Sequence, residues 1–571
     1  MKDRIPKYFG SILVLLALNF LLFLPYYLAV YTQHDFLPFF PSHHPRGSYD
    51  LSLNSVKEYF LQMLFRRYNL DPFRLSVEMV FISCGLVLCR SFFSKGKAYF
   101  LFFATSSYLF VFLTETYRMT ISMVLDRSTL WLEDMQLIKS AIQFCMETLR
   151  LPDFSFEMLL GAVFLLVFAL IYRLFGYVWE GLKVSKKTAL ASNAFMLGSL
   201  SLFIWWFGLL RDDTNIQVLS KHLVYNYERC LVYLENNRNF PEQSEYHRKF
   251  YEKMGVKPNI FLFVIESYGM MLFNHKPLED RMNSLNREIE KELSAVDGLE
   301  MLSHKSTSPV YGGTSWLSTA SLLAGTWINN QARYELFKQV ASSFPHLINY
   351  LAYHSYQRVS FQPGTVRDGK LYGFDETFIR QDMDYKGAYI GWGGVPDYTT
   401  FKKMDERIKG LKRPFLLHYM SLSTHIPWQR PPALPHAIFS GADSQGNYDD
   451  PLAEGLMSGK ESMEDYFLTI SYEWRLMSHF FRKHLGKDFL VIIVGDHQPL
   501  TAKQVDPSHD VPIHILSDNP SIVAGFKKAG FRSGLIPPKQ AAIKHEMIYP
   551  ILLESLNMQK FQQYSAAKKA K

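Results

Sequence analysis

The chain has 571 residues, of which 48% are hydrophobic and 15% aromatic, and its formal net charge is +8. This length allows several domains, and the hydrophobic share is high for a wholly water-soluble protein. The positive charge comes without a basic helix, a zinc-finger spacing or an aromatic RNA-binding motif, so it excludes nucleic acid as the expected partner. No cysteine follows Cys230, so the second half has neither a disulfide framework nor a thiolate metal site.

Most of the apolar sequence lies before residue 211, in runs long enough to cross a bilayer. The first run follows three basic residues and lacks a small-residue cleavage site, which indicates an uncleaved transmembrane helix rather than a signal peptide. The second and fourth runs are the weakest, because Glu78 and Glu157 lie near their starts. We expect five spans, at residues 8–31, 75–93, 98–117, 156–178 and 188–210.

The basic residues of the short connections set the expected orientation. Lys and Arg gather before the first span, between the second and third, and between the fourth and fifth, which is one side of the membrane. The positive-inside rule makes that side the cytoplasm, so with five spans the chain after Leu210 emerges outside. Between the third and fourth spans, apolar residues at helical spacing predict a helix along the outer interface: Trp131, Leu132, Met135, Ile138, Ile142 and Met146.

The composition divides the chain into four parts. Residues 1–211 form the expected five-span domain, 212–257 a polar helical arm, 258–558 a soluble domain and 559–571 a basic tail. In the arm, Leu219, Leu223, Leu231 and Leu234 could pack on a neighbour.

In the soluble domain, apolar strand patterns alternate with helix patterns, which is typical of an α/β domain with a parallel sheet. The expected strands are 259–265, 414–420 and 489–494, and the expected helices are 316–323, 462–484 and 540–556.

Two of the expected strands end in residues that bind metals or transfer protons. The apolar run 260–265 stops at Glu266, and the run 489–494 stops at Gly495, Asp496 and His497. Because ligands of open α/β sheets bind at the carboxyl ends of the strands, these side chains are expected to meet. Carboxylate and imidazole together suit a divalent cation. Either stretch taken alone could be an ordinary surface feature of a strand end.

A third stretch, Gly312-Gly313-Thr314-Ser315, opens one of the expected helices. A hydroxyl at a helix start is most often an N-cap. Here, paired glycines also allow close approach of an anion, and the helix N-terminus offers amide donors to phosphate or sulfate. If the hydroxyl of Thr314 joins a metal held by Glu266, Asp496 and His497, it can act as a nucleophile near neutral pH.

These three stretches, behind the N-terminal apolar runs, resemble the lipoteichoic acid synthase and phosphoglycerol transferase branch of the alkaline phosphatase and sulfatase superfamily. The resemblance implies a multi-domain membrane protein with a sulfatase-like α/β domain outside the cytoplasm of a bacterial inner membrane. It implies one catalytic divalent cation, expected to be manganese with magnesium or zinc as alternatives, bound by Glu266, Thr314, Asp496 and His497. Thr314 is then the nucleophile that becomes phosphorylated, with Ser315 as the alternative.

The same resemblance assigns substrate contacts in the loops above the strands. His425, in Thr424-His425-Ile426-Pro427, matches a head-group-binding histidine and could also protonate the leaving oxygen. Arg367 is the best match to a phosphate-gripping arginine, although the aromatic residue expected just before it is missing. Trp392 and Asp397 fall near the expected cleft or serve as loop scaffolding. His509 and His514 could reach the site.

The expected activity is transfer of a glycerophosphoryl group from a phospholipid, plausibly phosphatidylglycerol, to an envelope glycan or polyglycerol phosphate. A phosphoethanolamine transferase is an alternative, although the cysteine-free second half lacks the disulfides of that group. A type I sulfatase needs a C/S-x-P-x-R motif, and Thr307-Ser308-Pro309 has Tyr311 in place of the arginine. A phosphodiesterase remains open. A receptor or transporter with an inert ectodomain would have a broken metal set, whereas all four ligands are present.

Overall fold

The structure, a computed structural model, describes thirteen stretches of the chain. They are residues 4–34, 76–93, 95–125, 129–135, 153–182, 184–207, 220–236, 254–365, 370–387, 390, 394–426, 428 and 463–557. The chain divides into two compact units, Met1–Asn236 and Asn237–Lys571; the described residues form one apolar core in the first and two in the second.

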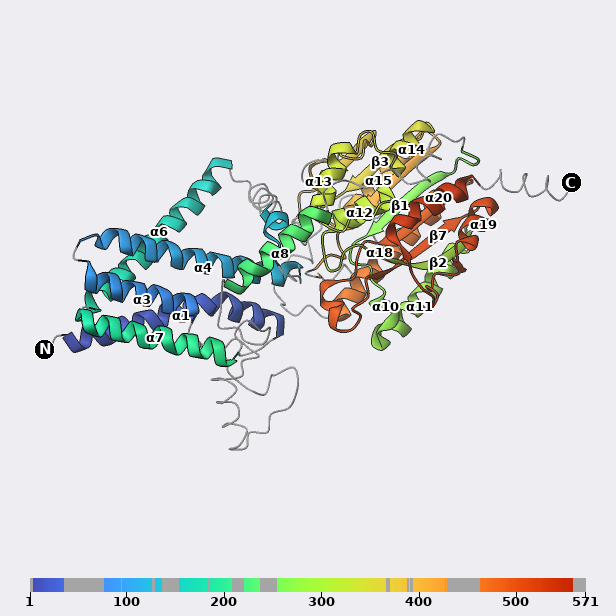
Figure 1. Cartoon of the computed structure of the whole chain (residues 1–571). Coiled ribbons are helices and arrows are strands. Elements are labelled where there is room, and N and C mark those ends of the chain that lie inside the picture. The colour runs from blue at the N-terminus through green and yellow to red at the C-terminus, as the bar shows by residue number, and fades with distance from the viewer. Residues whose placement is uncertain are drawn as a thin grey trace. The chain divides into compact units, whose positions relative to one another are not determined.

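The first unit is helical, as Figure 1 shows in blue to green. Side chains of α1, α3, α4 and α6 share its core, where Leu22, Leu86, Tyr108 and Phe175 are buried. The uninterrupted apolar runs explain these helices, because a helix satisfies its own backbone in an apolar surrounding. The elements are α1 (Arg4–His34), α3 (Val77–Phe92), α4 (Lys97–Leu125), α6 (Asp153–Gly181), α7 (Lys186–Phe207) and α8 (Ser220–Asn236).

Three of the described helices are long and apolar enough to cross a membrane: Lys7–Pro25, Lys97–Ile121 and Met158–Gly181. They indicate a membrane anchor in this part of the chain. α3 lies within the expected second span but has 16 residues. At 1.5 Å per residue it is about 24 Å long, shorter than the roughly 30 Å of a hydrocarbon core.

The structure describes parts of the expected arm and of the expected interface helix. Leu223, Leu231 and Leu234 on α8 are exposed within the first unit, and Leu219 lies outside the described residues. Buried Asn226 joins α8 to the stretch 129–135, because its amide nitrogen donates to Thr129 Oγ1 at 3.2 Å and its amide oxygen accepts from the backbone nitrogen of Trp131 at 3.3 Å. The expected interface helix is helical at residues 131–135, and its remainder is outside the described residues.

The second unit is built on one nine-stranded sheet, in the order β4-β3-β5-β1-β6-β7-β2-β8, with β9 beside β2. Its strands are β1 (Asn259–Ile265), β2 (Glu300–Thr307), β3 (Gln357–Gln362), β4 (Glu376–Ile379), β5 (Phe415–Met420), β6 (Phe489–Gly495), β7 (Asp510–Ser517), β8 (Arg532–Ser533) and β9 (Ile543–Lys544). β4, β3, β5, β1 and β6 are parallel.

The expected parallel sheet is found over five strands, and the sheet is mixed beyond β6. β7 runs antiparallel to both β6 and β2, and β8 runs antiparallel to β2. β2 and β7 were missed because polar residues interrupt their apolar patterns. Ser303 of β2 and His514 of β7 are buried as a hydrogen-bonded pair at 2.7 Å, which makes those polar positions compatible with a central strand.

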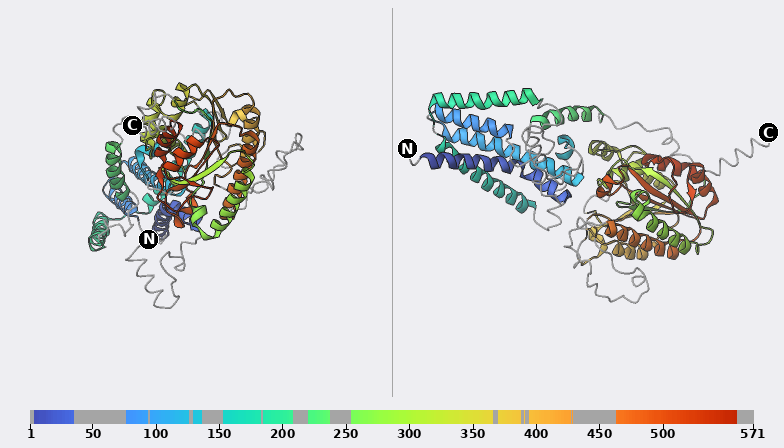
Figure 2. Two further views of the ribbon diagram at one scale, coloured as in Figure 1. Left: turned by 90° about the vertical axis from the view of Figure 1, so that its right-hand side faces the viewer. Right: turned by 90° about the horizontal axis from the view of Figure 1, so that it is seen from below.

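Two helix layers cover the sheet, and the alternation along β1 shows why. Ile260, Leu262 and Val264 face one apolar core, and Phe261, Phe263 and Ile265 face the other. Figure 2 shows the sheet between these layers. The first core is covered by α12 (Ser315–Ala324), α13 (Gln331–Val340), α14 (Leu347–Tyr353), α19 (Pro520–Lys528) and α20 (Ile548–Leu556), and the second by α10 (Met271–Asn274), α11 (Lys276–Leu293), α15 (Asp397–Ile408) and α18 (Met463–His484).

The helix expected at residues 540–556 is wrong in its first half. Ile543–Lys544 form β9, His545–Met547 form the short 3-10 helix η5, and α20 begins only at Ile548. Burial explains the difference, because the imidazole of His545 is buried and hydrogen-bonded to Ser306 Oγ at 2.8 Å. The two other 3-10 helices are η3 (Arg380–Met383) and η4 (Leu500–Gln504).

Candidate active site

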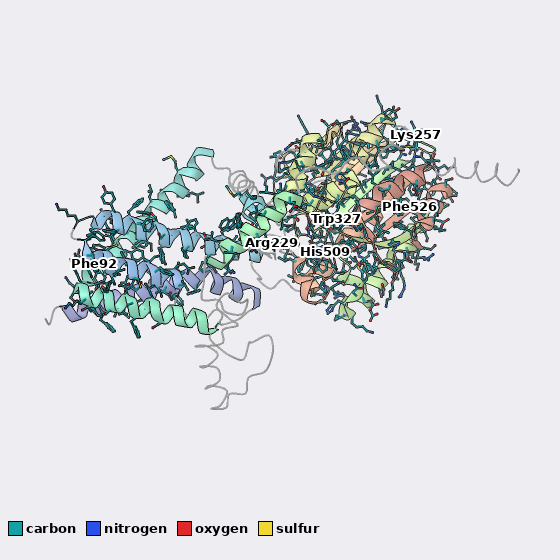
Figure 3. The ribbon with its side chains drawn as sticks, in the orientation of Figure 1. Phe92, Arg229, Lys257, Trp327, His509 and Phe526 are labelled. Carbon is teal, nitrogen blue, oxygen red and sulfur yellow. The ribbon has the colours of Figure 1, made fainter. Side chains whose placement is uncertain are left out.

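The site lies where three neighbouring parallel strands end. β1 is hydrogen-bonded to β5 on one side and to β6 on the other, so their carboxyl ends share one edge of the sheet. Figure 3 labels one residue at each edge of the sheet. His509 precedes the antiparallel β7 and so lies at the edge that carries the site, whereas Lys257 precedes β1 and lies at the opposite edge. Glu266 directly follows β1, and Asp496 and His497 directly follow β6.

Glu266, Asp496 and His497 meet in one buried cluster, as the sequence predicted. Each offers a ligand atom, and all three atoms lie within 4.8 Å of one another. His497 Nε2 is 3.3 Å from Glu266 Oε1 and 3.4 Å from Asp496 Oδ2. Two ligands of a common cation at about 2.1 Å stand roughly 3.0 to 3.4 Å apart, so this spacing suits a single bound ion.

The hydrogen bonds of His497 also suit a metal. Its Nδ1 lies 2.8 Å from the carbonyl oxygen of Gln498, which can only accept, so Nδ1 donates. In the neutral ring, Nε2 then presents a lone pair toward the two carboxylates. A cation between these atoms would remove the repulsion, and a backbone carbonyl on the other nitrogen is the usual partner of a ligating histidine.

The electrostatics of the two carboxyls lead to the same conclusion. Burial raises the pKa of Asp496 well above its ordinary value, and the negative charge of Glu266 raises it further. Burial would also raise the pKa of Glu266, but electrostatic interactions with the imidazoles of His497 and His425, together with hydrogen bonds, outweigh it, so this pKa is lowered. Without a cation, the cluster therefore holds one carboxylate easily and the second only at a cost. The residues fit a divalent metal.

Ordinary polar groups fix the carboxylate of Asp496 in place. Asp496 Oδ1 accepts from the backbone nitrogens of Ser267, at 2.8 Å, and His497, at 2.6 Å. Its backbone carbonyl accepts from the hydroxyls of Ser308, at 2.5 Å, and Ser318, at 2.7 Å. The sequence analysis did not identify Ser308 or Ser318 as site residues. The local sequence around a serine does not indicate a hydrogen-bond partner that lies 188 or 178 residues away.

The start of α12 brings hydroxyls to the cluster. Thr314 is the N-cap residue but makes no capping hydrogen bond, and its backbone has φ 60° and ψ 41°. This left-handed conformation is strained for a β-branched residue, at a cost of about 1–3 kcal/mol, and such strain gathers at functional sites. Thr314 therefore does not act as an ordinary N-cap, the alternative that the sequence analysis left open, because its side chain makes no capping hydrogen bond.

The two hydroxyls of this turn point to different partners. Thr314 Oγ1 donates to the carbonyl oxygen of Gly313 at 2.6 Å. Ser315 Oγ donates to Glu266 Oε2 at 2.8 Å and lies 3.2 Å from His497 Nε2. The hydroxyl that contacts the cluster of Glu266, Asp496 and His497 is therefore that of Ser315, and Thr314 precedes it in the chain.

His425 lies on the turn after β5, the third strand end of the site. Its Nδ1 donates to the carbonyl of Ile426, and its imidazole interacts electrostatically with Glu266. The turn is joined to the metal cluster, because the backbone nitrogen of Glu266 donates to Ser421 Oγ at 2.9 Å. Ser421 is a supporting residue that the sequence analysis missed, although its place at a strand end is a signal that could have found it.

The remaining sequence candidates have other positions. Arg367 and Trp392 lie outside the described residues. His514 is buried between Ser303 and Tyr268, with its pKa lowered to about 3 by burial, so it is a neutral structural residue. His509 lies against the ring of Tyr311. Asp397 is fully buried and holds backbone nitrogens of the His425 turn.

The fold and this cluster define an α/β domain with side chains that could hold a metal, and hydroxyls beside them, at the carboxyl edge of its sheet. Residues 258–515 match the family model described as Sulfatase. The second unit therefore contains a sulfatase-like domain over these residues. A search of curated proteins finds no match to the chain.

Solved structures of similar fold include proteins of the alkaline phosphatase superfamily. The lipoteichoic acid synthase LtaP from Listeria monocytogenes is 14% identical over 57% of this chain and 81% of its own, with a TM-score of 0.33. The phosphoglycerol transferase GacH from Streptococcus pyogenes is 13% identical over 58% and 86%, with a TM-score of 0.33. The lipooligosaccharide phosphoethanolamine transferase EptA from Neisseria meningitidis is 11% identical over 94% and 97%, with a TM-score of 0.44.

Proposed function

We propose that this protein is a membrane-anchored, metal-dependent transferase that moves a glycerophosphoryl group from a phospholipid, phosphatidylglycerol, to an envelope glycan or polyglycerol phosphate. The observation that carries this proposal is the buried cluster of Glu266, Asp496 and His497 beside the strained turn of Thr314 and Ser315. A sulfatase-like domain and membrane-capable helices in one chain support a lipid substrate.

Glu266, Asp496 and His497 would hold one divalent cation, with the Thr314 hydroxyl as a fourth ligand and manganese as the expected ion. When bound, the cation would favour the ionised hydroxyl and offset charge on the transferring phosphoryl group. Catalysis of phosphoryl transfer depends mainly on such positioning and charge stabilisation.

Before the first step the Thr314 hydroxyl loses its proton to solvent; its Oγ1 then attacks phosphorus, and the bond between phosphorus and the diacylglycerol oxygen breaks. His425 gives a proton to that oxygen, so diacylglycerol leaves and glycerol phosphate is esterified to Thr314. In the second step an acceptor hydroxyl attacks the same phosphorus and loses its proton to His425, while the bond between phosphorus and Thr314 Oγ1 breaks and Thr314 leaves as the alkoxide used in the next cycle. Arg367 and Trp392 are assigned to head-group binding in this proposal.

The anchoring has a physical reason, because both the donor and departing diacylglycerol stay in a membrane. We propose five spans, with α3 and α7 beside the three helices that meet the length and apolarity of a span, and a catalytic domain outside the cytoplasm of a bacterial inner membrane. Labelling of single cysteines introduced into exposed positions of the catalytic domain, with reagents unable to cross the membrane, tests this orientation.

The test of the activity is incubation of the purified full-length protein with head-group-labelled phosphatidylglycerol and manganese. We expect diacylglycerol release and a labelled adduct that peptide mapping places on Thr314. Label on Ser315 would transfer the nucleophilic role to the hydroxyl that contacts Glu266. A parallel reaction with phosphatidylethanolamine separates the two head groups, and release from that lipid alone would overturn the glycerophosphoryl assignment.

A further inference from the structure

A second pair of buried carboxyl groups lies outside the cluster of Glu266, Asp496 and His497. Asp397, the first residue of α15, and Glu473, in the middle of α18, are each fully buried. The helices α15 and α18 pack on the same apolar core, Tyr419 of β5 donates to Glu473 Oε1, and Asp397 acts on Glu473 as a hydrogen-bonding side chain. Two carboxylates cannot form a hydrogen bond unless a proton lies between them, so this contact requires at least one protonated group.

The hydrogen bonds around the pair differ between its two members. Asp397 accepts from backbone nitrogens: that of Leu422 lies 3.0 Å and 2.8 Å from its two carboxylate oxygens, and that of Ser423 also donates to it. Glu473 Oε1 accepts from the phenol of Tyr419 at 2.9 Å. No donor among the described residues reaches its buried Oε2. Amide donors stabilise a charged carboxylate, so Asp397 is the ionised member and Glu473 the protonated one.

Among the residues that the structure describes, no cation is found to act on this pair. The titratable groups facing it are the pair itself and Tyr419 of β5. Basic residues of α15 and α18 pair with other acids, as shown by Lys403 with Asp384, Arg407 with Glu376, Arg475 with Glu288, and Lys483 and His484 with Asp405. A proton is therefore what offsets the second negative charge.

The pair lies directly behind the turn that carries His425. Asp397 holds Leu422 and Ser423, and its own backbone nitrogen donates to Ser423 Oγ at 3.0 Å. The backbone nitrogen of His425 donates to the carbonyl of Leu422 at 2.9 Å, which closes the turn. On its other side the turn is joined to Glu266 through Ser421.

We propose that Asp397 and Glu473 share one proton and that this protonated pair is a positioning device for His425. Loss of the proton would leave two buried negative charges in contact, and their repulsion would move α15 and its grip on the turn. The proposal rests on the proposed function only for its effect on turnover, because the shared proton can be observed without substrate.

The key variant is Glu473→Gln. Its amide oxygen can accept from Tyr419 and its amide nitrogen can donate to Asp397, so it copies the protonated state at every pH. The matched control is Glu464→Gln on the same helix, since Glu464 is half exposed and pairs with Arg281. Asp397→Asn is the disruptive variant, because an amide cannot offer two acceptor oxygens to Leu422 and Ser423.

The first measurement is the infrared spectrum of the full-length, metal-saturated protein near pH 8. We expect the carbonyl stretch of a protonated carboxyl group, which ionised carboxylates lack, in the wild type and in Glu464→Gln but not in Glu473→Gln. Absence of this band from the wild type, or its persistence in Glu473→Gln, would overturn the shared proton whatever the activity of the protein.

The second measurement is thermal unfolding against pH. Burial, followed by the charge of Asp397, raises the pKa of Glu473 well above its ordinary value. A raised pKa gives stability that is complete below the ordinary glutamate pKa and is lost as pH rises through the folded one. The melting temperature of Glu473→Gln should therefore gain on that of the wild type as pH increases. A constant difference would contradict the pair.

The third measurement is turnover with phosphatidylglycerol. Asp397→Asn should lower kcat by about tenfold or more with manganese affinity unchanged, as a misplaced reacting group predicts. In Glu473→Gln the alkaline fall of kcat should move to higher pH. If no variant or wild type turns over this lipid while the infrared band is present, the proposed function fails and the shared proton stands. Turnover with identical pH profiles would reject the positioning role alone.

Discussion

The catalytic unit buries two acidic pairs, and they solve the same electrostatic problem differently. Glu266 and Asp496 have an imidazole lone pair and a serine hydroxyl beside them, whereas Asp397 and Glu473 have a phenol and backbone amides. A cation suits the first set of donors and a shared proton the second. Buried carboxyls alone therefore do not identify a metal site; the neighbouring nitrogen and hydroxyl do.

The largest expected effect separates chemistry from binding at the first pair. Thr314→Ala should lower turnover of phosphatidylglycerol by at least about three orders of magnitude, because removal of a nucleophile ends the covalent route. Its metal affinity should weaken yet remain measurable. Ser315→Ala is the matched control with a smaller expected loss, and steady-state diacylglycerol release measures both. Full activity in Thr314→Ala with loss in Ser315→Ala would reverse their roles.

The next prediction breaks the first pair as a metal site. At a manganese concentration of 100 times Kd, binding should stabilise the wild type by about 2.7 kcal/mol, since the ion binds the folded state. Asp496→Asn should lose most of this gain, and Glu473→Gln should keep it. Thermal unfolding with and without manganese measures the difference. An unchanged gain in Asp496→Asn would mean that the ion binds elsewhere.

At the second pair, Tyr419→Phe should lower the free energy of unfolding by about 1–3 kcal/mol. The variant removes the phenol that donates to Glu473 Oε1 and leaves a buried acceptor without a partner. Chemical denaturation of the full-length protein measures the loss. Manganese should shift the stability of this variant as much as that of the wild type, and a lost shift would mean that the two pairs are not separate.

The smallest expected effect concerns the support of Asp496. Ser318→Ala removes one of two hydroxyl donors to its backbone carbonyl, and Ser308 still donates there. We expect a loss of about 0.5–1.5 kcal/mol in the free energy of unfolding. The double variant Ser308→Ala and Ser318→Ala should lose more than the sum of the singles, because only then is the carbonyl left without either donor. Exact additivity would contradict this shared role.

The strands that carry the first pair could be predicted from the sequence. The apolar runs before Glu266 and Asp496 are continuous, and a parallel-sheet strand buried on both faces leaves that signal. By contrast, β2 and β7 bury serine and histidine pairs, so their polar letters hide them. Whether such a buried polar side chain has a hydrogen-bond partner depends on a residue 211 or 239 positions away in the chain, and the local sequence does not indicate it.

The site was predictable in its residues and less so in its orientation. Glu266, Asp496 and His497 follow strand ends, so topology alone brings them together. The order of the two hydroxyls depends on the left-handed backbone at Thr314, which turns Ser315 toward Glu266. The pairing of Asp397 with Glu473 was equally hidden, because α15 and α18 become neighbours only when both pack on the same face of the sheet.

The central claim is that Glu266, Asp496 and His497 hold one cation, and counting bound manganese tests it most directly. Electron paramagnetic resonance of free manganese, during titration of the full-length protein, gives the number of ions bound per chain. We predict one ion for the wild type and none for Glu266→Ala, with the variant still folded by circular dichroism. No bound ion in the wild type, or one ion in both proteins, would contradict the account.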